Sequence, residues 1–302
     1  MGELWIRSAT GHSVEVKESV TQHLQLPPAV MKVVLGNQLA RLRELAEVTQ
    51  EDAAAVLGCT QQKIAHIEGG SGIKLIELNA LLDRYAANEA DRAYTRDLQS
   101  ESNRRTKRGA FSTRFRQYLR LLVDMEPSCN RYFSYQALVI PGLLQTEDYM
   151  RRNARAWRPS LTADEIDKYA ANRLARQRVL ENADQQFWFI IDEAALRRTE
   201  GGPVMKAQIK RLVETIDRPN VELQVVPFGV GYYMGQGHDY TIFGYDTKPA
   251  VDIIYLEQHD GGEYVDNSKR TARYLTLWDH QKAAASGPEQ TRRALLGIAS
   301  SL

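Results

Sequence analysis

A short stretch in the first third of the chain carries polar side chains whose types suit contact with DNA bases. Thr60 is expected to cap a helix, and Ile64 and Ile67 are spaced to face inward. The outward side of that helix carries Gln61, Gln62, Lys63 and His66. A glutamine can form two hydrogen bonds with adenine, and a lysine can reach O6 and N7 of guanine. These four residues are therefore candidate base-contacting residues, although His66 is alternatively an ordinary surface histidine.

Two further helices must hold this helix in place. Leu35, Leu39 and Leu42 form one apolar stripe, which predicts a helix before residue 46. Thr49 can cap a second, alanine-rich helix, with Asp52 three residues on as its partner. Gly58 follows, where the chain must turn sharply into the next helix. Gln50, at the start of the second helix, is placed either to hold a DNA phosphate or to brace the third helix.

Together these positions carry a family resemblance. The matching residues are Thr49-Gln50-Glu51, Ala53, Leu57-Gly58, Ile64 and Ile67-Glu68. They resemble the XRE-type, lambda-repressor-like helix-turn-helix family. The resemblance implies sequence-specific binding in the DNA major groove, commonly as a dimer. Ala65-His66 departs from the Ser-Arg that is frequent in the family. A helical bundle used only for protein contact is the alternative.

The charge of the chain is unevenly distributed. The whole sequence has 39 basic and 38 acidic residues, so only a local patch could attract nucleic acid. Residues 31–90 hold six basic and eight acidic residues, whereas residues 91–120 hold nine and three. Phosphate neutralisation supplies much of the affinity for DNA. Arg104 and Arg105 are therefore candidates for contacts with the DNA backbone, and a solvated linker is the alternative.

The sequence predicts an all-α N-terminal helix-turn-helix domain followed by an α+β C-terminal domain. Strand-like patterns cover 187–191, 221–225, 240–243 and 251–256, and a Thr162-to-Glu165 capping box opens a helix to about residue 182. A sheet of three or four strands is expected. The predicted divisions are an N-terminal extension over 1–30 with short strands, the helix-turn-helix domain over 31–99, a basic linker over 100–110 and the C-terminal domain over 111–302.

The C-terminal part carries a second resemblance. Its motifs are Ile140-Pro141-Gly142, Asn172–Arg178, Asp192-Glu193, Val221–Phe228, Tyr255-Leu256-Glu257 and Tyr264. In this order they resemble the C-terminal domain of actinobacterial Scr-type, antitoxin-like XRE regulators, a domain with no established activity. The resemblance implies a transcription regulator that works with a small partner protein encoded nearby.

Two features of this domain leave alternatives open. Arg173, Arg176 and Arg178 could hold a phosphate or carboxylate ligand, but salt bridges are favoured, with Glu193 and Glu257 as the expected partners. The glycine-rich stretch 229–238 opens no helix and lacks the Lys-Ser/Thr of a phosphate loop. It is expected to be a flexible connection between strands, or a lid over a ligand pocket.

Several classes of protein are excluded. Two cysteines cannot build a disulfide-rich scaffold, and the six histidines lack the spacing of metal ligands. No catalytic motif, membrane span or secretory signal is present, so we expect no enzyme, no cofactor and no metal. The sequence predicts a cytoplasmic, homodimeric transcription regulator that binds double-stranded DNA. The alternative is an antitoxin-like protein that sequesters a small partner and binds DNA for autoregulation.

Overall fold

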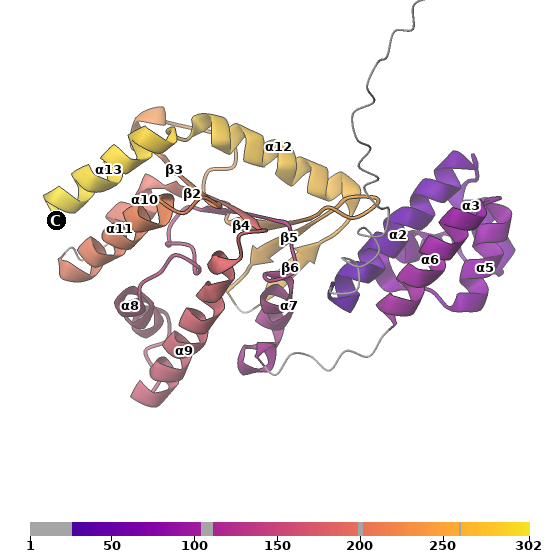
Figure 1. The fold of residues 1–302 in the computed structure, drawn as a ribbon, viewed down its shortest axis with the longest axis horizontal. Coiled ribbons are helices and arrows are strands. Elements are labelled where there is room, and N and C mark those ends of the chain that lie inside the picture. The colour runs from indigo at the N-terminus through magenta and orange to yellow at the C-terminus, as the bar shows by residue number, and fades with distance from the viewer. Residues whose placement is uncertain (1–25, 104–110, 199–201, 260) are drawn as a thin grey trace, which may run out of the picture.

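The computed structural model describes residues 26–103, 111–198, 202–259 and 261–302. Figure 1 shows a helical N-terminal region beside a domain in which helices cover a mixed sheet. The predicted fold class, an all-α helix-turn-helix domain followed by an α+β domain, is confirmed. The strands expected within residues 1–25 lie outside the described residues.

The N-terminal domain is a bundle of short helices around one long helix. Its elements are α2 (Pro28–Leu45), α3 (Gln50–Leu57), α4 (Gln61–His66), the π-helical turn η2 (Ile67–Ser71), α5 (Leu75–Arg84) and α6 (Glu89–Ser102). The leucine stripe of α2 is buried, with Leu35, Leu39 and Leu42 between 0% and 4% exposed. The last turn of α6 lies within the stretch 100–110 that the sequence assigns to a linker, and the division into domains stays a prediction.

The C-terminal domain contains one mixed sheet of six strands. They are β1 (Arg131–Gln136), β2 (Gln186–Asp192), β3 (Val221–Val226), β4 (Tyr240–Tyr245), β5 (Val251–Glu257) and β6 (Gly262–Val265), in the order β3-β2-β1-β4-β5-β6. The β1–β2 and β2–β3 pairs are parallel, and the other pairs are antiparallel. The expected three or four strands were too few. The sequence did not predict β1, because Arg131, Ser134 and Gln136 interrupt its apolar pattern. It did not predict β6, because that strand has only four residues.

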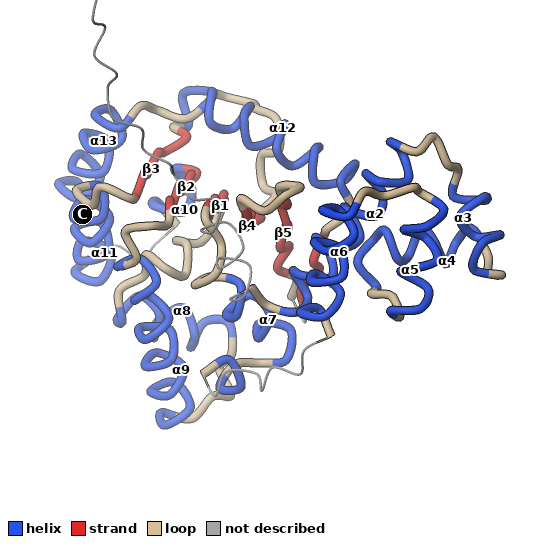
Figure 2. Tube along the Cα trace, turned by 45° about the vertical axis from the view of Figure 1, so that its right-hand side comes forward, coloured by secondary structure: helices blue, strands red, loops and turns tan. Residues whose placement is uncertain are grey.

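Helices lie on both faces of the sheet. They are α7 (Gln117–Met125), α8 (Glu147–Trp157), α9 (Ala163–Arg176), α10 (Glu193–Arg197), α11 (Pro203–Ile216), α12 (Ser268–Ala284) and α13 (Pro288–Ser301), with 3-10 turns η3 (Ser112–Arg114), η4 (Gln177–Glu181) and η5 (Phe228–Val230). Trp278 of α12 packs in one apolar cluster with Ile190 and Ile254 of the sheet. Figures 1 and 2 show α7, α8 and α9 on the opposite face from α12.

Two local expectations differ from the structure. The helix predicted to reach residue 182 is α9 followed by η4, so the α-helix ends at Arg176. The alternation over 221–225 predicts a half-buried strand, but Gln224 is only 8% exposed. Its side chain accepts a hydrogen bond from Trp188 Nε1 at 2.9 Å and donates one to the Ser286 carbonyl at 3.0 Å. Burial of a glutamine is tolerated here because both ends of its amide are satisfied.

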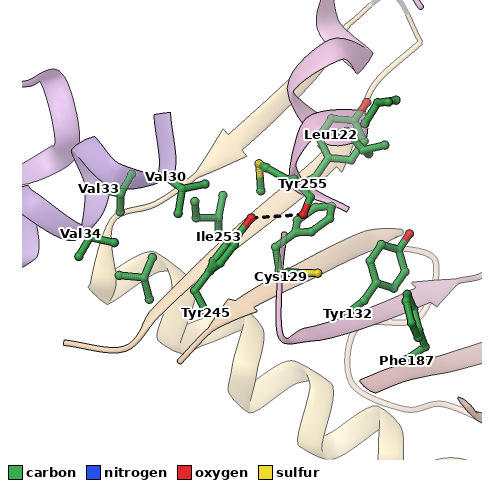
Figure 3. Packing of buried hydrophobic residues seen from close by; sticks show 14 of the residues in the cluster. Val30, Val33, Val34, Leu122, Cys129, Tyr132, Phe187, Tyr245, Ile253 and Tyr255 are labelled. Carbon is green, nitrogen blue, oxygen red and sulfur yellow. Dashed lines mark hydrogen bonds between the residues drawn. The ribbon is translucent and has the colours of Figure 1, made fainter. Parts of the chain in front are cut away.

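The two domains share an apolar core at their junction. Val30, Val33 and Val34 of α2 belong to the same buried cluster as Tyr245 of β4 and Ile253 of β5, as Figure 3 shows. Beside this contact lies a cavity of about 910 Å³ between α2, α6 and the turn that joins β4 to β5. Helix α2 of the N-terminal domain is therefore packed directly onto the sheet.

Candidate nucleic-acid interface

Helix caps set the turn between α3 and α4. Thr49 Oγ1 accepts a hydrogen bond from the Asp52 amide at 3.1 Å, and Asp52 Oδ2 accepts one from the Thr49 amide at 3.2 Å. Gly58 ends α3 with φ of 60°, a left-handed conformation that glycine adopts at low cost. Thr60 Oγ1 then accepts a hydrogen bond from the Lys63 amide at 3.3 Å and caps α4. The three predicted features are confirmed.

The inward side of α4 fixes its orientation. Ile64 and Ile67 are 1% and 3% exposed and pack in the core with Ala53 and Ala54 of α3. A Cβ on Gly36 of α2 would lie 2.4 Å from the Glu68 carbonyl oxygen, so α2 approaches η2, directly after α4, more closely than an alanine would allow. With this side buried, the opposite side of α4 must face solvent.

That outer face presents three polar side chains that have no hydrogen-bond partner in the part of the chain that the structure describes. Gln61, Gln62 and His66 are all exposed, and no hydrogen bond joins their side chains to other described residues. Their amide and imidazole groups are therefore available to acceptors and donors on a DNA base. Thr60 is exposed as well, but its hydroxyl serves as the cap of α4.

Lys63 lies on the same helix but is paired within the domain. Its Nζ donates to Glu77 Oε1 of α5 at 2.6 Å, with 45% and 21% of the two side chains exposed. The hydrogen bond to Glu77 raises the pKa of Lys63, and the same bond lowers the pKa of Glu77. Contact between Lys63 and a base would require this pair to open.

Gln50, predicted either to hold a phosphate or to brace the third helix, is hydrogen-bonded within its own domain. Its Nε2 donates to Glu68 Oε2 at 2.8 Å, just beyond α4. Glu68 also receives hydrogen bonds from Arg43 at 2.6 and 3.1 Å, and the Arg43 and Glu68 side chains are only 12% and 9% exposed. The hydrogen bond to Glu68 raises the pKa of Arg43. This buried Arg43–Glu68 pair was not recognised in the sequence, because the two residues lie 25 positions apart.

The two predicted phosphate contacts, Arg104 and Arg105, lie outside the described residues. Among the residues that the structure describes, no three His, Cys, Asp or Glu side chains gather as metal ligands would. None of the described helices is both long and apolar enough to cross a bilayer.

Comparison with known families supports both halves of this architecture. Residues 34–94 match a family described as a helix-turn-helix domain. Residues 119–297 match the domain of unknown function DUF5753, which spans more than half of the chain. The chain belongs to the DUF5753 family. No curated protein and no solved structure matches it. The helix-turn-helix domain indicates DNA binding and regulation, and no enzyme family is indicated.

In the DUF5753 domain, Arg176 pairs with a carboxylate other than the two that the sequence predicted. Arg176 donates two hydrogen bonds of 2.6 Å to the two oxygens of Glu126, which follows α7. Glu193 pairs instead with Arg197 at 2.6 Å, and Glu257 lies within 4.0 Å of no basic group among the described residues. The prediction of Glu193 and Glu257 as partners was therefore wrong. Glu126 was missed because it lies 50 positions from Arg176.

Hydrogen bonds hold the glycine-rich stretch of the DUF5753 domain, residues 229–238, in place at several points. Tyr233 donates a short hydrogen bond to Asp192 and lies 2.5 Å from the Tyr135 hydroxyl. The Gly235 carbonyl accepts a hydrogen bond from Gln281 at 3.1 Å. Four apolar side chains nevertheless project from η5 and this stretch, with 40% to 98% of their surface exposed: Phe228, Val230, Tyr232 and Met234. We call these four residues the apolar ridge.

Proposed function

We propose that the protein is a sequence-specific transcription regulator that binds double-stranded DNA in the cytoplasm through α4. The observation that carries this proposal is the outer face of α4, where Gln61, Gln62 and His66 are exposed and have no side-chain partner among the described residues, on a helix capped by Thr60 and anchored by Ile64. An α-helix fits the major groove, where glutamine can bind adenine through two hydrogen bonds. Lys63 adds a fourth base contact, and Arg104 and Arg105 add phosphate contacts.

We further propose that the regulator is a homodimer and that the C-terminal domain mediates dimerisation together with partner or effector binding. α4 has only six residues, so a single copy can contact few base pairs. Helix-turn-helix dimers gain specificity from two half-sites about 34–36 Å apart on the duplex. The shared core of α2 with β4 and β5 supports coupling between the two domains.

The test is capture of genomic DNA fragments by the purified full chain at about 150 mM salt, followed by sequencing. A palindromic site is expected for the native chain. Joint replacement of Gln61 and Gln62 by alanine should abolish the enrichment. Gln290→Ala, which changes an exposed glutamine of α13, is the matched control and should retain it. Enrichment without a common sequence would contradict sequence-specific binding.

A second candidate function is an antitoxin-like protein that sequesters a small partner and binds DNA for autoregulation. The apolar ridge favours it, because exposed apolar side chains held on a fastened segment are typical of protein interfaces. Co-expression with genes adjacent to its own tests this function. A bound partner should be lost on replacement of Phe228 and Tyr232 by serine and kept with Ile76→Ser, a change at a 78% exposed site on α5.

A further inference from the structure

Two guanidinium groups meet beneath the sheet of the DUF5753 domain, next to the turn at Gly142. Arg173 and Arg176 lie three residues apart on α9, so they share one side of the helix. The point where a Cβ of residue 142 would stand is 3.1 Å from Arg173 Nη1 and 3.7 Å from Arg176 Nη1. The absence of a side chain at Gly142 therefore lets both guanidinium groups approach this turn closely.

The two arginines differ in how their charge is compensated. Arg176 uses Nε and Nη2 for the pair with Glu126, and these two side chains are 10% and 2% exposed. Burial alone lowers the pKa of Arg176, but attraction and hydrogen bonding to Glu126 outweigh burial and raise it. Glu126 is fully engaged by this pair. Arg176 Nη1, which borders Gly142, has no hydrogen-bond partner among the described residues.

Arg173 lacks such a partner. Its single hydrogen bond to a described residue runs from Nη1 to Gln145 Oε1 at 3.3 Å, and its guanidinium lies 4.6 Å from the ring centroid of Tyr169. No carboxylate of the described residues lies within 4.0 Å of it. Burial, with repulsion from Arg176, lowers the pKa of Arg173, and interactions with Tyr169, Glu257 and Glu126 only partly offset this. A guanidinium has five N–H donors, so most of its hydrogen-bonding capacity is unused.

The residues around the Arg173 guanidinium leave it partly accessible to solvent. Arg173, Tyr169 and Gly142 are each half-buried rather than sealed, and Glu257 at the end of β5 is exposed. An arginine fork matches the geometry of phosphate and carboxylate oxygens. We propose that Arg173 and Nη1 of Arg176, across Gly142, bind a phosphate or carboxylate group of a small ligand.

The test uses the full chain and inorganic phosphate, without DNA, so its outcome is independent of the proposed function. Phosphate is titrated at constant ionic strength against chloride, and binding is followed by calorimetry and by the shift in Tm. We expect saturable binding that Arg173→Gln abolishes. Arg178→Gln, which removes an exposed charge two residues beyond α9, is the matched control and should bind as the native chain does. A parallel titration with acetate distinguishes a carboxylate site from a phosphate site.

A second variant guards against misfolding. Gly142→Ala retains both arginines but places a methyl group 3.1 Å from Arg173 Nη1, so binding should weaken at least about tenfold. Phosphate can also raise Tm without a site, because it is excluded from protein surfaces. An equal, unsaturable rise in the native chain and in Arg173→Gln would overturn the proposal, as would undiminished binding in Gly142→Ala.

Discussion

Lys63 and Gln50 lie on or beside the face proposed to meet DNA, yet each is hydrogen-bonded to a glutamate of its own domain. The two glutamates differ in exposure. The Lys63–Glu77 pair lies near the surface, where an ion pair adds little net stability, whereas a good base contact contributes about 1–3 kcal/mol. Lys63 can therefore exchange Glu77 for a base. Glu68 is held in a buried pair with Arg43, so Gln50 is expected to remain a brace.

Replacement of Lys63 by alanine should consequently relax specificity at one base pair. The expected loss of discrimination is about 1–3 kcal/mol at that position. Competition between the operator and single-base variants measures it. Lys210→Ala removes a 79% exposed lysine from α11 and should leave the discrimination intact. A uniform loss across all variants would assign Lys63 to phosphate contact instead.

Arg104 and Arg105 should behave differently from Lys63. Their neutralisation to glutamine should weaken binding to operator and random DNA alike. The plot of log affinity against log salt should flatten by about 0.9 for each lost phosphate contact. Titrations at several salt concentrations measure the slope. An unchanged slope would favour the solvated linker.

Among the elements, α2 and η2 depend on a close approach at Gly36. An alanine there would place its Cβ 2.4 Å from the Glu68 carbonyl oxygen, which is backbone and cannot turn aside. Gly36→Ala should therefore destabilise the fold by about 1–3 kcal/mol. Gly297→Ala in α13 meets nothing within 4 Å and should instead stabilise by about 0.5–1 kcal/mol. Denaturant unfolding of both variants tests the opposite signs.

The cap of α3 makes its stability depend on pH. Hydrogen bonds from Thr49 lower the pKa of Asp52 in the folded chain. The stabilisation is therefore present above the unfolded pKa of about 4 and is lost as pH falls through the lower, folded pKa. Asp52→Asn should reduce the loss of Tm on acidification. Glu51→Gln, which removes the preceding exposed carboxylate, should preserve the native pH dependence.

At the scale of the whole molecule, the junction of α2 with the sheet unites the two domains. Ile253 is 4% exposed and belongs to the cluster that contains Val30 and Val34. Ile253→Ala should cost about 2–5 kcal/mol and separate the unfolding of the two domains into two calorimetric transitions. Leu212→Ala, on the buried side of α11 in the core of the C-terminal domain, should lower Tm without separating them. Similar splitting in both variants would argue against coupling through this junction.

Local features of this protein could be predicted from its sequence. The caps at Thr49, Thr60 and Thr162 and the turn at Gly58 all depend on residues within three or four positions, and the structure confirms them. The outward face of α4 followed from the same local spacing, because burial of Ile64 and Ile67 fixes which side remains exposed.

The partners of the charged and polar side chains were decided by the tertiary structure. Glu77 lies 14 positions from Lys63, Glu68 lies 18 from Gln50, and Glu126 lies 50 from Arg176. Spacing along the chain cannot identify such pairs, because they form only where packing brings separate helices together. Strands β1 and β6 also could not be predicted from local sequence, because β1 contains several polar residues and β6 has only four residues. Both strands are stabilised by backbone hydrogen bonds to neighbouring strands, which only the tertiary structure brings together.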